Sequence, residues 1–182
     1  MKIADTAIAG CFEITPEIRS DDRGTFVKYF QRSEFSERGL ITEFAEEYHS
    51  FSVRNVVRGL HFQSPPHSHI KMVLCLTGTI FDAVVDLRVG SPTYGRHFST
   101  ELSASNAKVL YIPEGLAHGY SVCSESAVVL YKVTSAYAPA HDKGIRWNSA
   151  GIAWENSTPI TSERDQKLPA LSDFVSPFLF RI

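Results

Sequence analysis

One short segment of the chain holds most of the side chains that could do chemistry. Residues 57–71 read VRGLHFQSPPHSHIK and contain three histidines and two cations. His61 has apolar neighbours on both sides, which predicts a strand, and period-two alternation puts His61 and Gln63 on one face. A lone histidine in a strand is often a hydrogen-bonded core residue. The charges of Arg58 and Lys71 in the same segment favour a chemical site instead.

A metal centre is one alternative for these histidines. Residues 67–69 form an HxH pattern, and residues 113–118, PEGLAH, form PxGxxH. Together they are two halves of the metal signature of cupins, in which three histidines and a glutamate converge on one ion. The carboxylate is missing, because residues 72–74 are Met, Val and Leu where it should fall. The pattern therefore favours a cupin-type barrel with His118 facing inward and with no metal and no other cofactor.

Other common reaction signatures are absent from the sequence. It contains no GxGxxG, no P-loop and no GxSxG, which argues against dinucleotide, nucleoside-triphosphatase and α/β-hydrolase chemistry.

Short strands separated by turns must position these residues. The apolar runs 72–76 and 79–87 flank Gly78 and predict a hairpin, and Pro113 ends a run at 108–112 or marks a sheet edge. Further strands are expected at 8–14, 25–30, 49–54, 96–101, 120–123 and 127–131.

Helix is scarce in the sequence. Residues 33–38 predict one or two turns with Ser33 as the N-cap and Gly39 as the stop, while Pro169 and Pro177 exclude a long helix in the tail. Many short strands in one chain indicate an all-β fold, and a cupin-type jelly roll with a few short helical turns is the prediction.

Length and composition set the remaining limits. The 182 residues, 43% of them hydrophobic, suit a single domain over 1–182. A net charge of -2 offers no field for nucleic acid or an anionic membrane. Three cysteines cannot all pair within the chain, and the N-terminal sequence resembles no signal peptide, so a cytoplasmic location is expected.

A series of motifs points to a family. In order and spacing these are Asp22-Arg23-Gly24, residues 57–63 (VRGLHFQ), Lys71, residues 81–88, residues 91–95 (SPTYG), residues 112–119 (IPEGLAHG) and Tyr131-Lys132. From about residue 3 to about residue 170, the chain resembles the dTDP-4-dehydrorhamnose 3,5-epimerases, metal-free cupin jelly rolls of bacterial deoxysugar synthesis.

The resemblance implies a proton transfer next to the C4 ketone of a nucleotide-linked 4-keto-6-deoxyhexose. His61 matches the family's base, and Asp165 matches the carboxylate that pairs with it. Tyr131 matches the acid that returns a proton from the other face. Imidazole, with a pKa of about 6.5, and phenol, with a pKa of about 10, suit these two roles at neutral pH. Lys71 matches the cation beside the enolate oxygen, and Asp82 is expected to hold Lys71.

The resemblance also implies the residues that contact the substrate. Arg23 and Arg58 match contacts to the diphosphate or the sugar, and Asp142 stands where the family usually has the longer Glu. The full set expected to bind substrate is Arg23, Lys28, Glu46, Tyr48, Arg58, Gln63, Lys71, His118, Tyr137, Asp142 and Arg164.

The chain departs from the family pattern at a few positions. Lys28 replaces a common Glu, and Glu46, Glu47 and Tyr48 stand where the family often has Gln, any residue and Asn. His69 replaces a common Gln. In the family the position of Lys28 and that of Glu46–Tyr48 contact the nucleotide end of the substrate, so a CDP- or GDP-linked sugar is an alternative to a dTDP-linked one.

Several functional alternatives stay open at this level. A single-site 3- or 5-epimerase could use the same base, and a metal-binding cupin oxygenase or sensor could use His67 or His69 with His118. A sugar-binding cupin without activity is a third. The resemblance implies a homodimer whose substrate is a nucleotide-diphosphate sugar.

Overall fold

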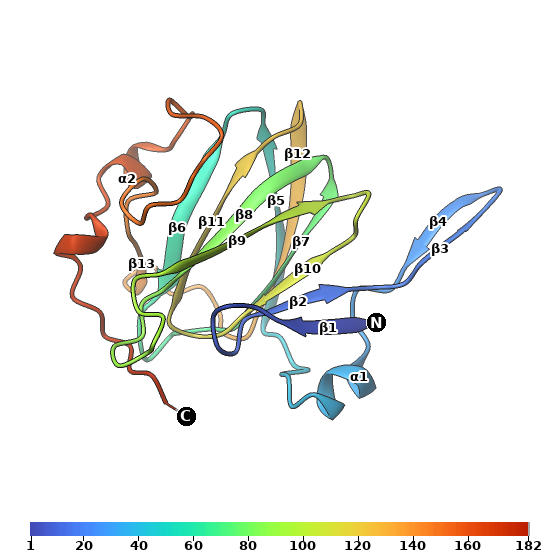
Figure 1. Ribbon diagram of the computed structural model, residues 1–182, viewed down its shortest axis with the longest axis horizontal. Helices are drawn as coiled ribbons and strands as arrows, with labels where there is room; N and C mark the ends of the chain where they lie inside the picture. The colour runs from blue at the N-terminus through green and yellow to red at the C-terminus, as the bar shows by residue number, and fades with distance from the viewer. Residues whose placement is uncertain (182) are drawn as a thin grey trace.

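The computed structural model describes residues 1–181 as two facing antiparallel sheets with a small separate hairpin (Figure 1). The six-stranded sheet has the order β1-β2-β10-β7-β12-β5 and the five-stranded sheet β13-β6-β11-β8-β9. This arrangement confirms the predicted all-β, two-sheet fold. The strands are β1 (Lys2–Asp5), β2 (Phe12–Thr15), β3 (Ile18–Asp21), β4 (Gly24–Val27), β5 (Glu46–Val53), β6 (Val57–Gln63), β7 (Lys71–Thr77), β8 (Thr79–Asp86), β9 (His97–Ser103), β10 (Val109–Ile112), β11 (Leu116–Val122), β12 (Ser126–Val133) and β13 (Asp142–Gly144).

The predicted hairpin around Gly78 is wrong, although both of its strands exist. β7 lies in the six-stranded sheet and β8 in the five-stranded sheet, so the two strands are not paired. Gly78, with φ of +81°, is the corner at which the chain crosses from one sheet to the other. An apolar run reveals a strand but not its partners: β7 pairs with β10 and β12, and β8 pairs with β11 and β9.

Alternating side chains of the central strands fill separate cores, which explains their continuous apolar runs. Val73 of β7 and Val84 of β8 belong to the core between the two sheets. Leu74 of β7 packs on the outer side with Phe35. Val85 of β8 packs on the opposite outer side, under the C-terminal segment. Each sheet is thus buried on both faces over its centre, and the space between the sheets holds the first core.

The few helical turns cover these outer faces. They are α1 (Arg32–Glu37), α2 (Glu163–Gln166) and the 3₁₀ turn η1 (Leu171–Asp173), so the prediction of no long helix in the tail is confirmed. Ser33 is not the N-cap: Gln31 takes that place without a side-chain hydrogen bond. Gly39, with φ of +69°, does end the helix. No helix among residues 1–181 is long and apolar enough to cross a membrane.

The hairpin of β3 and β4 extends away from the two sheets (Figure 1). Its strands pair only with each other, and Phe26 on it is 61% exposed. Arg23 lies at its turn, where its guanidinium pairs with the Asp21 carboxylate at 2.6 Å.

Candidate active site

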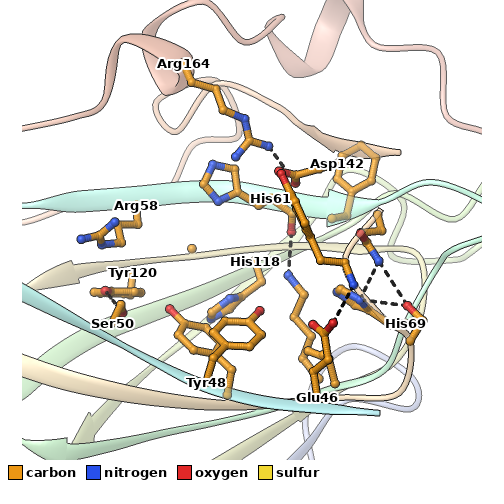
Figure 2. Close-up of a pocket in the computed structure, with 18 residues that line it drawn as sticks. Glu46, Tyr48, Ser50, Arg58, His61, His69, His118, Tyr120, Asp142 and Arg164 are labelled. Atoms are coloured by element: carbon orange, nitrogen blue, oxygen red, sulfur yellow. Dashed lines mark hydrogen bonds and ion pairs between the residues drawn. The ribbon is translucent and has the colours of Figure 1, made fainter. Parts of the chain in front are cut away.

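A cavity of about 430 Å³ opens between the two sheets. Figure 2 shows Glu46 and Tyr48 on one side of this pocket and His61 and Arg58 on the other. The first pair belongs to β5 of the six-stranded sheet, and the second to β6 of the five-stranded sheet. The predicted site residues that line the pocket are Glu46, Tyr48, Arg58, His61, Gln63, Lys71, His118, Tyr131, Tyr137, Asp142 and Arg164.

His61 is paired with Asp165 at the wall of the pocket. Its Nε2 lies 2.6 Å from Oδ1 of Asp165, while the Gly59 amide donates to Oδ2 at 3.3 Å. Burial alone raises the pKa of Asp165, but the bonds from His61 and Gly59 outweigh it and hold the pKa below its usual value. An ionised Asp165 accepts the Nε2 proton, so His61 Nδ1 is the nitrogen that remains free to take a proton.

A bulge in the sheet brings Arg58 onto the same side as His61. His61 pairs with His118 and Arg58 with Tyr120, so the three-residue step on β6 faces a two-residue step on β11. Strict alternation would separate Arg58 from His61, yet both line the pocket. The two strands approach closely there, since a Cβ on Gly119 would lie 2.6 Å from the Arg58 carbonyl oxygen.

The partner of Asp82 is His118, which corrects the expectation that Asp82 holds Lys71. His118 Nε2 lies 2.8 Å from Oδ2 of Asp82, and both side chains are buried. The other carboxylate oxygen of Asp82 has no hydrogen-bond partner among residues 1–181. Burial raises the pKa of Asp82, and His118 opposes that rise. Asp82 therefore lies behind the pocket wall and orients His118.

Lys71 is a buried cation at the pocket. Its Nζ donates to the carbonyl oxygen of His61 at 3.2 Å. Burial lowers the pKa of Lys71 to about 8, and the carboxylates of Asp142 and Asp82 oppose this fall. The ammonium form thus predominates at neutral pH and exposes a positive charge to anything bound in the pocket.

Tyr131 is a buried phenol on β12, in the sheet opposite His61. Burial raises its pKa well above the usual value, and the nearby Tyr120 adds to that effect. The phenol is therefore protonated at neutral pH. Neither Tyr120 nor Ser50 was among the expected site residues, although both line the pocket. The predicted strands at 49–54 and 120–123 began too late to include Tyr48 and His118, so the two-residue spacing that places Ser50 and Tyr120 beside them was not visible.

Polar side chains cross the mouth of the pocket. Arg164 of α2 pairs with Asp142 of β13 at 2.7 Å, as Figure 2 shows. The Tyr137 amide donates to Glu46 at 3.1 Å. Gln63 lines the pocket but its amide is engaged by the protein, since its Oε1 accepts the Ala138 amide proton at 2.6 Å. Gln63 thereby holds the loop that carries Tyr137.

Two expected substrate contacts lie elsewhere. Arg23 and Lys28 are not among the residues that line this pocket, and the side chain of Arg23 is 90% exposed on the projecting hairpin. The motif alone could not reveal this, because it fixes residue types and not where in the fold they lie.

The histidines considered for a metal do not gather. His67 packs against the His141 ring at 4.5 Å between centroids. Burial, followed by the charge of Lys71, lowers the pKa of His69 to about 3, so it is neutral. Across residues 1–181, no group of three or more His, Cys, Asp or Glu side chains is placed to hold a metal ion.

The fold and the site together define a class: a jelly roll whose pocket has a histidine on one sheet, paired with an aspartate from a helix, and a buried phenol on the other sheet, an arrangement suited to proton transfer. The family model for dTDP-4-dehydrorhamnose 3,5-epimerase matches residues 5–173. The chain belongs to this family, and its predicted cupin-type fold is confirmed by the structures of the family's members.

Individual relatives agree with that assignment. A dTDP-4-dehydrorhamnose 3,5-epimerase from Shigella flexneri is 38% identical over 91% of this chain and 93% of its own length. A dTDP-4-dehydrorhamnose 3-epimerase from Streptomyces niveus is 39% identical over 95% and 85%. The solved structure of dTDP-6-deoxy-D-glucose-3,5-epimerase from Legionella pneumophila, in complex with dTDP-4-keto-L-rhamnose, superposes with a TM-score of 0.93 at 33% identity over 99% of both chains.

Proposed function

We propose that this protein epimerises C3 and/or C5 of a nucleotide-linked 4-keto-6-deoxyhexose, with dTDP-4-dehydro-6-deoxyglucose as substrate and dTDP-4-dehydrorhamnose as product of the double inversion. The observation that carries the proposal is the placement of the His61–Asp165 pair and Tyr131 on opposite walls of one pocket. A sugar ring between the sheets then loses a proton on one face and gains one on the other.

His61 is the base. Its Nδ1 takes the proton from the carbon next to the C4 ketone, the C–H bond breaks, and its electrons move to the ketone oxygen to form an enolate. Asp165, bonded to Nε2, stabilises the resulting imidazolium. The neighbouring ammonium of Lys71 stabilises the enolate oxygen more than the ketone, which lowers the barrier.

Tyr131 is the acid. The enolate collapses to the ketone, a new C–H bond forms with the phenol proton, and the phenolate then regains a proton while His61 releases the one it took. The buried, protonated state of Tyr131 at neutral pH suits this role. Asp82 is a positioning residue, because it acts through His118. The side chains assigned to direct substrate binding in the same pocket are Glu46, Arg58, Lys71, His118, Tyr137, Asp142 and Arg164. The ring of Tyr48 lines the same pocket, and so does Gln63, whose amide is engaged by the protein.

The protein acts as a homodimer in which the hairpin of β3 and β4 of one subunit brings Arg23 and Lys28 to the pocket of the other. Three observations support this: the hairpin projects from the sheets, its apolar residue Phe26 is exposed, and neither cation lines the pocket of its own chain. A cytoplasmic location is also proposed, supported by the three free cysteines.

Complementation tests the shared site. R23A and H61A variants are mixed and allowed to exchange subunits. With shared sites, half of the dimers are heterodimers with one intact pocket each, so activity recovers to about a quarter of wild type. If each pocket is self-contained, mixing gives no more than the mean of the two parent activities.

Proton NMR in deuterated water with dTDP-4-keto-6-deoxyglucose tests the reaction. Deuterium entry at both C3 and C5 is expected for the 3,5-epimerase, and entry at one carbon identifies a single-site enzyme. The His61→Ala variant is the control and should exchange neither position while keeping the wild-type circular dichroism. An absence of exchange in the wild-type protein would contradict the proposal.

A further inference from the structure

Tyr48 lies directly against the proposed acid. β5 and β12 are antiparallel neighbours, and their register pairs Tyr48 with Tyr131. The two rings are stacked, with centroids 5.0 Å apart and an interplanar angle of 20°. Aromatic pairs in this cross-strand position stabilise the arrangement of their two rings.

A second ring contacts Tyr131 from another direction. The imidazole of His118 meets the Tyr131 ring edge-on, at 6.1 Å between centroids and 75° between planes. His118 is itself fixed by its bond to Asp82. Tyr131 is thus held between two rings, of which the His118 ring is buried and anchored. Tyr48 lies on β5, which pairs only with β12 and forms the end of its sheet.

We propose that Tyr48 is a positioning residue that holds the ring of Tyr131 where its hydroxyl can protonate the enolate, so that each deprotonation ends in inversion. This inference rests on the proposed function and extends it to the fate of the enolate. A displaced Tyr131 leaves the enolate to be protonated again by His61, from the face that lost the proton. The product then carries solvent deuterium but has kept its configuration.

The ratio of inversion to exchange with retention therefore reports the position of the acid. It is measured separately at C3 and C5 by proton NMR in deuterated water, with dTDP-4-keto-6-deoxyglucose and the full-length protein. A loss of folded protein lowers both processes equally and leaves this ratio unchanged. Only a change in the competition between His61 and Tyr131 alters it.

Three variants make the test specific. Tyr48→Leu removes the stacked ring, and we expect the ratio to fall by roughly two- to tenfold, the factor that an aromatic pair supplies. Tyr48→Phe keeps the ring without the hydroxyl and should retain the wild-type ratio. Phe51→Leu removes a 60% exposed ring from the same strand outside the pocket and should also retain it.

Three results would overturn the inference. An unchanged ratio in Tyr48→Leu, whatever its total rate, shows that the stack does not position the acid. An equal fall in Tyr48→Phe shows that the Tyr48 hydroxyl acts directly on the substrate. An absence of exchange in the wild-type protein refutes the proposed function and this inference with it, and the wild-type spectrum alone distinguishes that case.

Discussion

Replacing Lys71 with methionine should stabilise the fold while it removes activity. Burial lowers the pKa of Lys71 from 10.5 to about 8, and a fall of this size corresponds to about 3 kcal/mol at 1.36 kcal/mol for each tenfold change in the acid constant. Methionine of similar length removes the buried charge but also the hydrogen bond to the His61 carbonyl oxygen, which contributes about 1 kcal/mol. The expected net gain in the free energy of unfolding at pH 7 is about 2 kcal/mol.

The pH dependence of this gain identifies its cause. The pKa of Lys71 is lower in the folded chain than in the unfolded chain, so the full cost of burying the ammonium is present below pH 8. Between pH 8 and pH 10.5 the folded protein releases this proton before the unfolded chain does, and the wild type recovers the lost stability. The advantage of Lys71→Met should therefore shrink across that interval and reverse at its upper end, where the variant lacks only the hydrogen bond and is less stable by about 1 kcal/mol.

Urea unfolding at a fixed protein concentration measures the effect. The free energies of unfolding of wild type and Lys71→Met are compared at pH 7 and at pH 10. Titratable groups that both proteins share cancel from the difference between them at each pH. A variant that is less stable than wild type at pH 7 would refute the reasoning, and so would an equal difference at the two pH values. The same variant should no longer exchange deuterium into the substrate, because it lacks the cation that stabilises the enolate oxygen.

Three further outcomes are expected. Asp165→Asn removes the carboxylate that orients His61, and kcat should fall by roughly 10²–10⁴-fold with the fold unchanged by circular dichroism; a loss below tenfold contradicts the pairing role. Gly119→Ala places a Cβ 2.6 Å from the Arg58 carbonyl oxygen, so thermal unfolding should report a destabilisation of about 1–3 kcal/mol, and an unchanged Tm would show that the strands can separate. The kcat of the wild-type enzyme should decline above about pH 8 as Lys71 loses its proton, whereas the activity of Lys71→Arg, which keeps its charge, should not fall over the same range; a wild-type profile that stays flat to pH 10 refutes the need for this charge.

The sequence predicts the central strands because they carry apolar runs, but it misses β1, β3 and β13, and the expected strand at 8–14 begins only at Phe12. It does not predict how they pair: β7 and β8 are separated by Gly78 alone, yet belong to different sheets. Pairing depends on which segments from elsewhere in the chain bury the same faces. The failed N-cap at Ser33 has a local cause, since the helix and its N-cap begin two residues earlier than the capping pattern indicates.

The site residues likewise fall into those that local sequence reveals and those that depend on the fold. His61 could be selected from its own neighbourhood, but Asp165 lies 104 positions away and was accessible only through the resemblance. Asp82 was expected to hold Lys71, but charge and spacing do not reveal that its hydrogen-bond partner is His118. The stack of Tyr48 on Tyr131 needs the register of β5 and β12, which no local pattern supplies.

The C-terminal segment has two tasks in this protein. It covers the outer core of the five-stranded sheet, with Phe178 packed beside Phe62, and it also carries Asp165 to His61. Few strand contacts tether it, among them the bridge from Val56 to Ile160. A segment of this kind detaches by local unfolding at a lower free energy than the sheets do. We therefore expect catalysis to be lost in a partial opening that leaves both sheets folded, so that activity reports the docking of this segment more sensitively than circular dichroism of the β structure does.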